Sequence, residues 1–307
     1  MNNKILVIGS SNVDFLIKSE KLPRLGETVT DGLFMQNYGG KGANQAVGAA
    51  RSGGNVAFIS CLGNDLYADE IIGNFGKDGI DSRYVFKEYG VATGSALVML
   101  DSKGNNYLSV APGANYRLNR EHIDAAIELF REAELILIQM EIPLDTTAYI
   151  FELAKKYRKR IVFNLAPARP FDLTMLENVY AFVVNEVETS MVTGLRVESE
   201  DEIKVAALAL LNWGPEMVII TLGAKGSFVA TKKESQFVPA FNVNATDTTA
   251  AGDIYCGSLA VALAEGKSLV EAVLFAGAAS AISVTRLGAQ PSAPTRDEID
   301  ALLLINV

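Results

Sequence analysis

Short apolar runs recur along the chain at intervals that fit buried strands. Lys4–Gly9 is an aliphatic and β-branched run that ends at glycine, a pattern typical of a strand buried on both faces. Similar runs occupy Val56–Leu62, Glu134–Met140, Arg160–Leu165, Ala181–Asn185 and Glu216–Leu222. Segments with helical spacing separate several of them: Asn119–Arg131, Thr146–Tyr157 and Glu200–Trp213. Apolar strands that alternate with helices predict a mostly parallel sheet covered by helices on both faces.

Two regions interrupt this rhythm. Residues 15–38 alternate loosely between apolar and polar positions, with turn signals at Pro23, Gly26 and Gly32. Residues 93–112 contain two short apolar runs around a polar, glycine-containing segment, which is a hairpin signal. We expect these regions, about 13–38 and 93–112, to form a small β lid on a single α/β domain of residues 1–307. The alternative is an antiparallel extension of the edge of the main sheet that does not move.

Composition and charge narrow the class of protein. The chain of 307 residues is 49% apolar and carries a formal net charge of −9, which argues against nucleic acid as a partner. Its longest apolar runs stop short of the roughly 20 residues that cross a bilayer. Residues 1–4 lead directly into the first strand pattern without the features of a secretory signal. We therefore expect a cytoplasmic protein with no membrane partner.

Cysteine and histidine usage limits the chemistry. Cys61 and Cys256 lie far apart in apolar stretches, and their spacing matches neither a disulfide framework nor a zinc site. We expect both to be small buried residues. His122 is the only histidine, and its surroundings predict the first turn of a surface helix. Proton transfer in an enzyme of this composition falls to a carboxylate, a lysine or a tyrosine.

The segment that ends at Asp253 has the features of an anion site. Ala250, Ala251 and Gly252 come immediately before a helix of small and apolar residues that ends near Gly266. Small residues at a helix start let a ligand approach the free backbone N–H groups. A carboxylate beside such amides supplies a base and donors for developing charge, which are parts of a phosphoryl-transfer site. A lone aspartate favoured by the helix dipole is the alternative.

A second glycine-rich segment covers residues 38–46. It is not a Walker A loop, because Lys41 is followed by Gly42 and not by Ser or Thr. Lys41 and Asn44 place donors at the start of the next predicted helix, which suits a ligand with several hydroxyl groups. A tight turn followed by close helix packing is the alternative.

The loop after the first strand, Gly9–Asp14, lacks the GxGxxG pattern and so disfavours a dehydrogenase. Asn12 and Asp14 project to the same side if the chain is extended. An amide and a carboxylate placed in this way can bind vicinal hydroxyl groups. Taken alone, the fragment is better explained as a plain turn.

Two further polar segments follow apolar strands, where ligands of α/β proteins collect. Asn185 and Glu188 share one face if a helix begins there, and the alternative is a helix cap with Glu at the third position. Thr221–Gly226 follows the last strand of the first pattern, and the alternative there is a hairpin turn.

Together these segments resemble the ribokinase family of sugar kinases, the PfkB superfamily, over nearly the whole chain. Asp247–Asp253 is the most specific match, followed by Gly39–Ala46. The resemblance implies a three-layer α/β sandwich with a small β lid, and phosphorylation of a small sugar by ATP. Lys41 in the Gly-Gly motif favours ribose. The alternatives are 2-deoxyribose or another small sugar, and a non-catalytic sugar-binding regulator, against which the intact Asp253 argues.

The resemblance also implies roles for single residues. Asp253 would deprotonate the primary hydroxyl of the sugar, and the amides of Ala250, Ala251 and Gly252 would form the anion hole. The sugar-binding positions, besides Asp253, are Asn12, Asp14, Gly40, Lys41, Asn44 and Glu141. The nucleotide-binding positions are Asn185, Thr221, Gly223 and Gly226.

Metal ions and a partner are implied in the same way. Glu188 would bind Mg²⁺ through water. The ligands of a K⁺ ion, mostly backbone carbonyls, would come from Asp247, Thr249, Ser283, Arg286, Gly288 and Ser292. A homodimer formed through the lid is expected. The sequence departs from the family pattern at Leu165, where proline is common, and at Gly277, where relatives often carry a larger residue near the adenine.

Overall fold

Nine strands form the main sheet of the computed structural model, which describes residues 4–305. In spatial order they are β13 (Ser235–Val238), β12 (Ser227–Thr231), β11 (Met217–Thr221), β10 (Ala181–Asn185), β9 (Arg160–Asn164), β8 (Leu135–Ile138), β1 (Lys4–Ile8), β4 (Asn55–Gly63) and β5 (Asp81–Glu88). Neighbours from β11 to β5 pair in parallel, and β12 and β13 pair antiparallel at one edge. The predicted mostly parallel sheet is confirmed.

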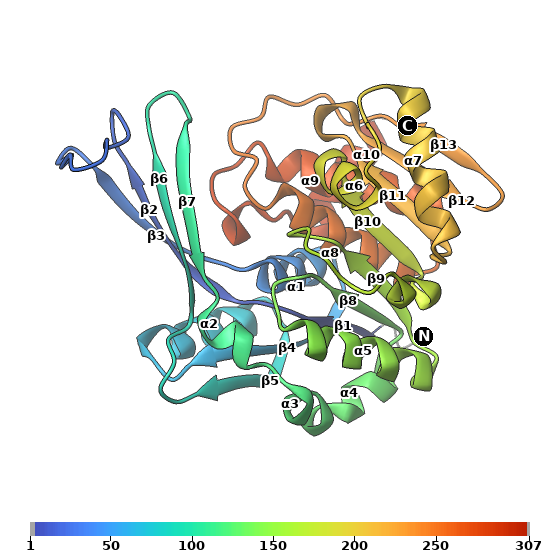
Figure 1. Ribbon diagram of the computed structural model, residues 1–307, viewed down its shortest axis with the longest axis horizontal. Coiled ribbons are helices and arrows are strands. Elements are labelled where there is room, and N and C mark those ends of the chain that lie inside the picture. The colour runs from blue at the N-terminus through green and yellow to red at the C-terminus, as the bar shows by residue number, and fades with distance from the viewer. Residues whose placement is uncertain (1–3, 306–307) are drawn as a thin grey trace.

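Helices cover both faces of this sheet (Figure 1). One face packs against α1 (Lys41–Arg51), α2 (Leu66–Lys77), α8 (Ala251–Ala264), α9 (Leu269–Ser283) and α10 (Arg296–Ile305). The other packs against α3 (Arg120–Ala125), α4 (Ile127–Glu132), α5 (Leu144–Tyr157), α6 (Glu186–Thr193) and α7 (Glu200–Asn212). Successive side chains of a strand point to opposite faces, so Ile5 and Val7 enter one core and Leu6 and Ile8 the other. These layers confirm the predicted three-layer sandwich.

The prediction of a single helix over Asn119–Arg131 is wrong in one respect. The chain turns more tightly at Ala126. Backbone hydrogen bonds between residues three apart replace the α-helical bonds between residues four apart, so α3 ends and α4 begins there. Apolar spacing does not distinguish these two kinds of turn over so short a segment. His122 lies in the first turn of α3, where its ring packs at a tilt of 36° against Phe86 and its Nε2 lies 3.2 Å from Glu88 Oε1. Both cysteines are buried and unpaired, as predicted.

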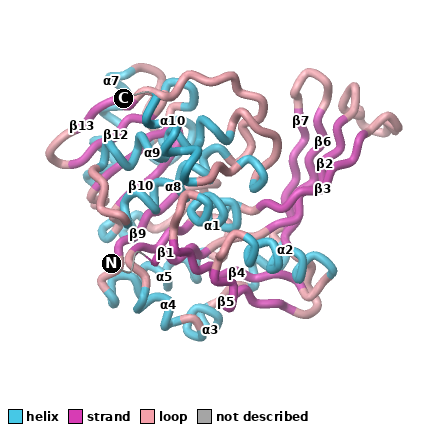
Figure 2. The backbone as a smooth tube through the Cα atoms, turned by 180° about the vertical axis from the view of Figure 1, so that it is seen from behind, coloured by secondary structure: helices cyan, strands magenta, loops and turns pink. Residues whose placement is uncertain are grey.

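The two regions that interrupt the apolar rhythm form a second sheet. It consists of β3 (Leu33–Gly39), β2 (Asn12–Lys18), β6 (Gly94–Leu100) and β7 (Asn106–Ala111) in that spatial order. We call it the lid sheet, after the role predicted for it. It is separate from the main sheet and projects from the body of the molecule (Figures 1 and 2), so it is not an extension of the main sheet's edge.

Helices α1 and α8 pack closely against each other. A Cβ atom at Gly257 of α8 would lie 2.4 Å from the carbonyl oxygen of Gln45 on α1, so only glycine fits at this contact. The residues at the starts of the two helices are thereby brought together.

No helix in the described part of the chain is long and apolar enough to span a membrane.

Candidate active site

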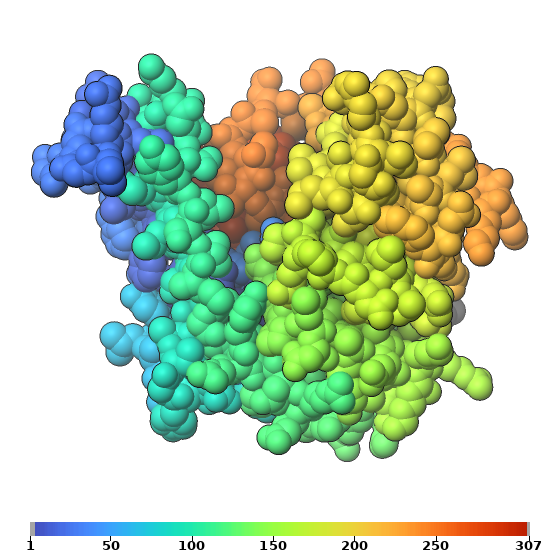
Figure 3. Space-filling model, viewed as in Figure 1, coloured from blue at the N-terminus to red at the C-terminus, as the bar shows by residue number. Residues whose placement is uncertain are grey.

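Polar residues gather at one edge of the main sheet, where its parallel strands end. Glu141 follows β8, Asn164 ends β9, Asn185 ends β10 and Thr221 ends β11. Ligands of α/β proteins bind at this edge. A hollow opens between the lid sheet, in blue and teal, and the orange and red C-terminal part of the chain (Figure 3).

Asp253 lies in the first turn of α8, and its side chain is held by α1. The carboxylate accepts hydrogen bonds from Asn44 Nδ2 at Oδ2 (3.0 Å) and from Gln45 Nε2 at Oδ1 (3.1 Å). Asp253 is buried but still 7% exposed. Gly40 allows α1 to begin here: its φ is 88°, and a Cβ atom would lie 2.7 Å from Ser11 Cα.

Other predicted sugar-binding residues surround this carboxylate. Glu141 accepts hydrogen bonds from Ser10 Oγ (2.5 Å) and from the Lys41 backbone N–H (3.1 Å). Asn12 is buried, and its oxygen accepts a hydrogen bond from Asn115 Nδ2 (2.7 Å). The structure therefore brings the end of β1, the start of α1 and the end of β8 to one place.

Asp14 is the most perturbed of these acids. Burial, together with the nearby Glu141 and Asp253 carboxylates, raises its pKa to about 6. Its side chain lies against Gly39, where a Cβ atom would meet the carboxylate at 2.0 Å. Neither carboxylate oxygen accepts a hydrogen bond from a described residue, so both can accept one from a ligand.

Lys41 provides the opposite charge. The Asp253 carboxylate raises the pKa of Lys41 against the effect of burial, and Glu141 and Glu188 raise it further. The ammonium group thus stays charged and lies within electrostatic range of three acids. A cation in this position can offset negative charge brought by a phosphorylated ligand.

The start of α8 forms a cradle of backbone amides. Ala250 takes the left-handed conformation with φ of 58°, and the Ala251 N–H donates to the Thr248 carbonyl (3.2 Å). Within the described chain, the Ala250 and Gly252 amides have no acceptor. A Cβ atom at Gly252 would meet nothing within 4 Å, so the space in front of the cradle is open. Two of the three predicted amides are therefore free to bind an anion.

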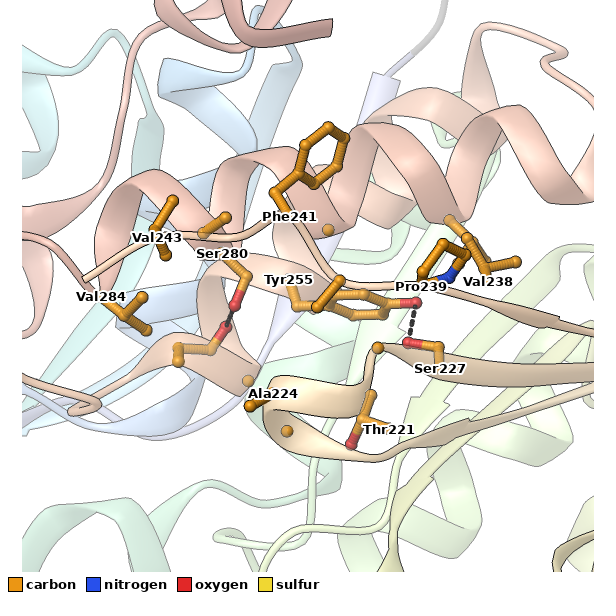
Figure 4. A pocket seen from close by; sticks show the side chains of 18 of the residues that line it. Thr221, Ala224, Ser227, Val238, Pro239, Phe241, Val243, Tyr255, Ser280 and Val284 are labelled. Atoms are coloured by element: carbon orange, nitrogen blue, oxygen red, sulfur yellow. Dashed lines mark hydrogen bonds between the residues drawn. The ribbon is translucent and has the colours of Figure 1, made fainter. Parts of the chain in front are cut away.

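A pocket of about 490 Å³ adjoins this cradle. Thr221, Gly223 and Gly226, whose binding to the nucleotide remains a prediction, line one part of it, and Ala251 and Gly252 line the part next to the cradle. Figure 4 shows the Tyr255 ring in the pocket with its hydroxyl toward Ser227 Oγ, at 3.1 Å. Thr221–Gly226 also forms the turn between the antiparallel strands β11 and β12. The segment is therefore a hairpin turn and also part of the pocket lining.

Gly277 leaves the pocket open on the side of α9. A Cβ atom there would lie 3.8 Å from the Phe241 ring, which is ordinary van der Waals contact. Phe241, Val243, Val273 and Leu274 give this part of the pocket an apolar lining. A flat aromatic group such as a nucleobase matches such a surface.

Asn185 and Glu188 form the start of α6 as a capping box. The Asn185 side chain accepts from the Glu188 N–H (2.8 Å), and Glu188 Oε2 accepts from the Asn185 N–H (2.9 Å). The capping interpretation is thus correct for Asn185. Burial raises the pKa of Glu188, although the Asn185 N–H and Lys41 lower it. Its second oxygen, Oε1, has no hydrogen-bond partner among the described residues and can still serve a ligand.

The residues expected around K⁺ lie on two loops that meet. Asp247 Oδ2 accepts from the Gly288 N–H (2.9 Å), and Asp247 Oδ1 accepts from the Thr249 hydroxyl (2.6 Å). Burial would raise the pKa of Asp247, but these hydrogen bonds lower it overall. The Ser283 and Ser292 hydroxyls lie 2.7 Å apart. The oxygen-rich set suits a hard cation.

Comparisons with known proteins agree with this geometry. The sequence profile of the pfkB family carbohydrate kinases matches residues 2–296. The chain is 39% identical to the ribokinase of Haemophilus influenzae over 97% of both chains. It is 36% identical to the deoxyribokinase of Salmonella typhi over 98% of this chain and 99% of the other. The structure of Arabidopsis thaliana ribokinase complexed with ribose and ATP superposes with a TM-score of 0.91, at 31% identity over 97% and 98% of the two chains.

The chain belongs to the PfkB family of carbohydrate kinases. The ribokinase-like fold and the sugar-kinase activity expected from the resemblance are confirmed. The roles of single residues remain predictions, although the structure gathers Asp253, Asn44, Lys41, Glu141 and Asp14 as those predictions require.

Several residues of this kinase's site were not singled out from the sequence. Gln45 contacts Asp253, Asn115 contacts Asn12, and Ser10 contacts Glu141. Gln139 and Asn164 both form hydrogen bonds with the Gln45 side chain. Gln139 and Asn164 could have been found in the sequence, because each is a polar residue at the end of an apolar run. A polar side chain buried at such a position requires a hydrogen-bond partner.

If Asp14 binds the sugar, as predicted, its raised pKa should make sugar binding sensitive to pH. The ionised carboxylate can accept hydrogen bonds from two hydroxyl groups, so affinity should be nearly full at pH 7 and should fall as pH drops through about 6. We expect the dissociation constant of the sugar to be about tenfold higher at pH 5 than at pH 7, as one protonation with a pKa near 6 requires. Calorimetric titration across this range measures it.

The matched variants are Asp14→Asn and Asp69→Asn. The asparagine side chain cannot ionise, so the Asp14→Asn variant should bind weakly with no dependence on pH between about 5 and 7. Asp69 is exposed on α2, and its replacement should leave the pH dependence unchanged. Wild-type affinity that stays constant down to pH 5 would contradict the prediction that Asp14 binds the sugar with a raised pKa.

Proposed function

We propose that this kinase transfers the γ-phosphoryl group of ATP to the primary hydroxyl of ribose, giving ribose 5-phosphate and ADP. The position of Asp253 carries this proposal: its buried carboxylate lies at an open amide cradle, with sugar-side acids on one side and the apolar pocket on the other. The ribokinases of Haemophilus influenzae and Arabidopsis thaliana, the second complexed with ribose and ATP, support it.

The residues suit an in-line transfer. The sugar oxygen forms a bond to the γ-phosphorus while its proton passes to Asp253. The bond between that phosphorus and the bridging oxygen breaks, and its electron pair leaves with ADP. The free amides of Ala250 and Gly252 stabilise the charge that develops on the phosphoryl oxygens, and Lys41 adds a positive charge. This scheme needs no histidine.

We further propose two cation sites. Glu188 would hold Mg²⁺ through water, because its Oε1 has no partner among the described residues. Such an ion neutralises the phosphates of ATP. Asp247 and Ser292, with the carbonyls of Thr249, Ser283, Arg286 and Gly288, would hold K⁺. The Arg286 side chain is paired with Glu298 (2.6 Å), so only its carbonyl is available.

The second candidate substrate is 2-deoxyribose. The deoxyribokinase of Salmonella typhi matches nearly the whole chain at 36% identity, close to the value for the ribokinase of Haemophilus influenzae. Asp14 favours ribose, because two free carboxylate oxygens are best used by two vicinal hydroxyl groups.

A coupled assay of ADP release tests the substrate. Wild-type protein is given Mg-ATP and K⁺ with ribose, 2-deoxyribose, fructose or adenosine. We expect the highest kcat/KM for ribose, with 2-deoxyribose at least about tenfold lower, because a buried acceptor loses its hydroxyl partner. A higher kcat/KM for any other acceptor would refute the assignment to ribose.

The same assay tests the monovalent cation when Na⁺ replaces K⁺. Activity with ribose should fall and should return when K⁺ is added back, and Asp247→Asn should need more K⁺ than wild type. Equal rates in the two salts would remove the proposed role of Asp247 and its neighbours. The assignment of the sugar substrate does not depend on the outcome of this cation test.

We also propose that two copies associate through their lid sheets. Large apolar side chains are exposed on these strands: Leu33, Phe34, Leu97, Tyr107 and Leu108. Exposed apolar side chains gathered on one small sheet are typical of an interface. We place the enzyme in the cytoplasm, where ATP is present and where its unpaired cysteines stay reduced, which cell fractionation checks.

Sedimentation equilibrium tests the dimer. We expect twice the mass of one chain for wild type and the mass of one chain for Leu108→Asp, because a charge in the interface is not solvated. Leu208→Asp, at a similarly exposed leucine on α7, is the matched control and should remain dimeric. A monomeric wild type at micromolar concentration would contradict the proposal.

A further inference from the structure

A buried chain of amide side chains reaches Asp253 from inside the protein. Gln45 on α1 and Gln139 after β8 are both fully buried. Gln45 Nε2 donates to Asp253 Oδ1 and to Asn164 Oδ1, both at 3.1 Å. On its other side, Gln45 Oε1 accepts from Gln139 Nε2 at 2.6 Å.

The chemistry of the neighbours selects one orientation for the Gln45 amide. An ionised carboxylate only accepts hydrogen bonds, so Asp253 requires the nitrogen of Gln45. Asn164 Nδ2 donates to the Val183 carbonyl (3.4 Å), which turns the oxygen of Asn164 toward Gln45. Gln139 donates to the oxygen of Gln45. A reversed Gln45 amide would place its oxygen against two acceptors and its nitrogen against a donor.

We propose that Gln45 is a positioning residue for the catalytic base, and that Gln139 acts through Gln45. The inference rests on the proposed role of Asp253. Asn44 holds Oδ2 and Gln45 holds Oδ1, so the carboxylate cannot rotate about its Cβ–Cγ bond without losing both hydrogen bonds. Its remaining lone pairs then keep a fixed direction toward the sugar hydroxyl. Such alignment accelerates a transfer by raising kcat and contributes little to ground-state binding.

Gln139 can be changed without leaving a new unpaired atom of its own. Its Oε1 has no partner among the described residues, and it fills the space beside Gly9, where a Cβ atom would lie 2.0 Å away. Methionine has a similar length and volume but no donor. Gln139→Met therefore removes the hydrogen bond that orients Gln45 while the packing is kept.

The test is a double-mutant cycle with Gln45→Met, Gln139→Met and the double variant. For Gln45→Met we expect kcat to fall about 30-fold, the effect of losing one charge-assisted hydrogen bond to a catalytic carboxylate. The KM for the sugar should stay within about threefold of wild type, since the sugar's own ligands are untouched. Gln139→Met should lower kcat by a smaller factor, and the double variant should match Gln45→Met.

Ser52→Ala is the matched control. The Ser52 and Ser258 hydroxyls form a buried hydrogen bond of 2.8 Å that also joins the end of α1 to α8. Its loss should lower the melting temperature without changing kcat. A purely structural role for Gln45 would give the same result as this control.

A Gln45→Met variant whose kcat stays within about threefold of wild type, or two substitutions whose effects on kcat multiply, would overturn the proposal. If ribose is not the substrate, the substrate assay on wild-type protein shows this independently of the variants. The double-mutant cycle is then measured with the sugar that the wild type phosphorylates. Should no sugar react, a neutron structure of wild type still decides. Deuterons on Gln45 that point to Gln139 would refute the relay, and deuterons that point to Asp253 would support it.

Discussion

The contact between α1 and the carboxylate of Asp253 is the constraint on which the rest of the site depends. Two amide donors on consecutive residues, Asn44 and Gln45, reach the two oxygens of one carboxylate. This requires the helices to approach closely, which Gly257 permits at the crossing and Gly40 permits at the start of α1. The glycines therefore serve the chemistry indirectly, by setting the distance between two helices that lie far apart in the sequence.

The same geometry explains how several acids share a small space. Asp14, Glu141, Asp253 and Glu188 all act electrostatically on one another or on Lys41. Glu141 and Asp253 are held by donors from nearby backbone and side-chain groups. Burial, together with the nearby Glu141 and Asp253 carboxylates, raises the pKa of Asp14 to about 6, and this acid has no such donor among the described residues. The acid without a protein donor is the one best able to exchange its solvation for the hydroxyl groups of a sugar.

Much of this arrangement could be predicted from the sequence because it depends on local patterns. Periodicity and turn signals indicate the apolar strand runs, the helix starting after Ala250 and the hairpin between Gly94 and Ala111. They do not indicate the break at Ala126, because it changes hydrogen bonding but not apolar spacing. Nor do they place Gln139 and Asn164 beside Gln45, because these contacts join distant strands and helices.

Whether Asp253 acts as the base, and not as a sugar ligand alone, is tested by measuring binding and turnover separately. Sugar and ATP affinities are measured by calorimetry for wild type and Asp253→Asn, and kcat is measured on the same preparations. We expect kcat to fall by about 100- to 10,000-fold in Asp253→Asn, the range for loss of a general base. ATP affinity should be kept, and sugar affinity should change far less than kcat. An Asp253→Asn variant that binds both ligands and turns over within about tenfold of wild type would contradict the role of Asp253 as the base.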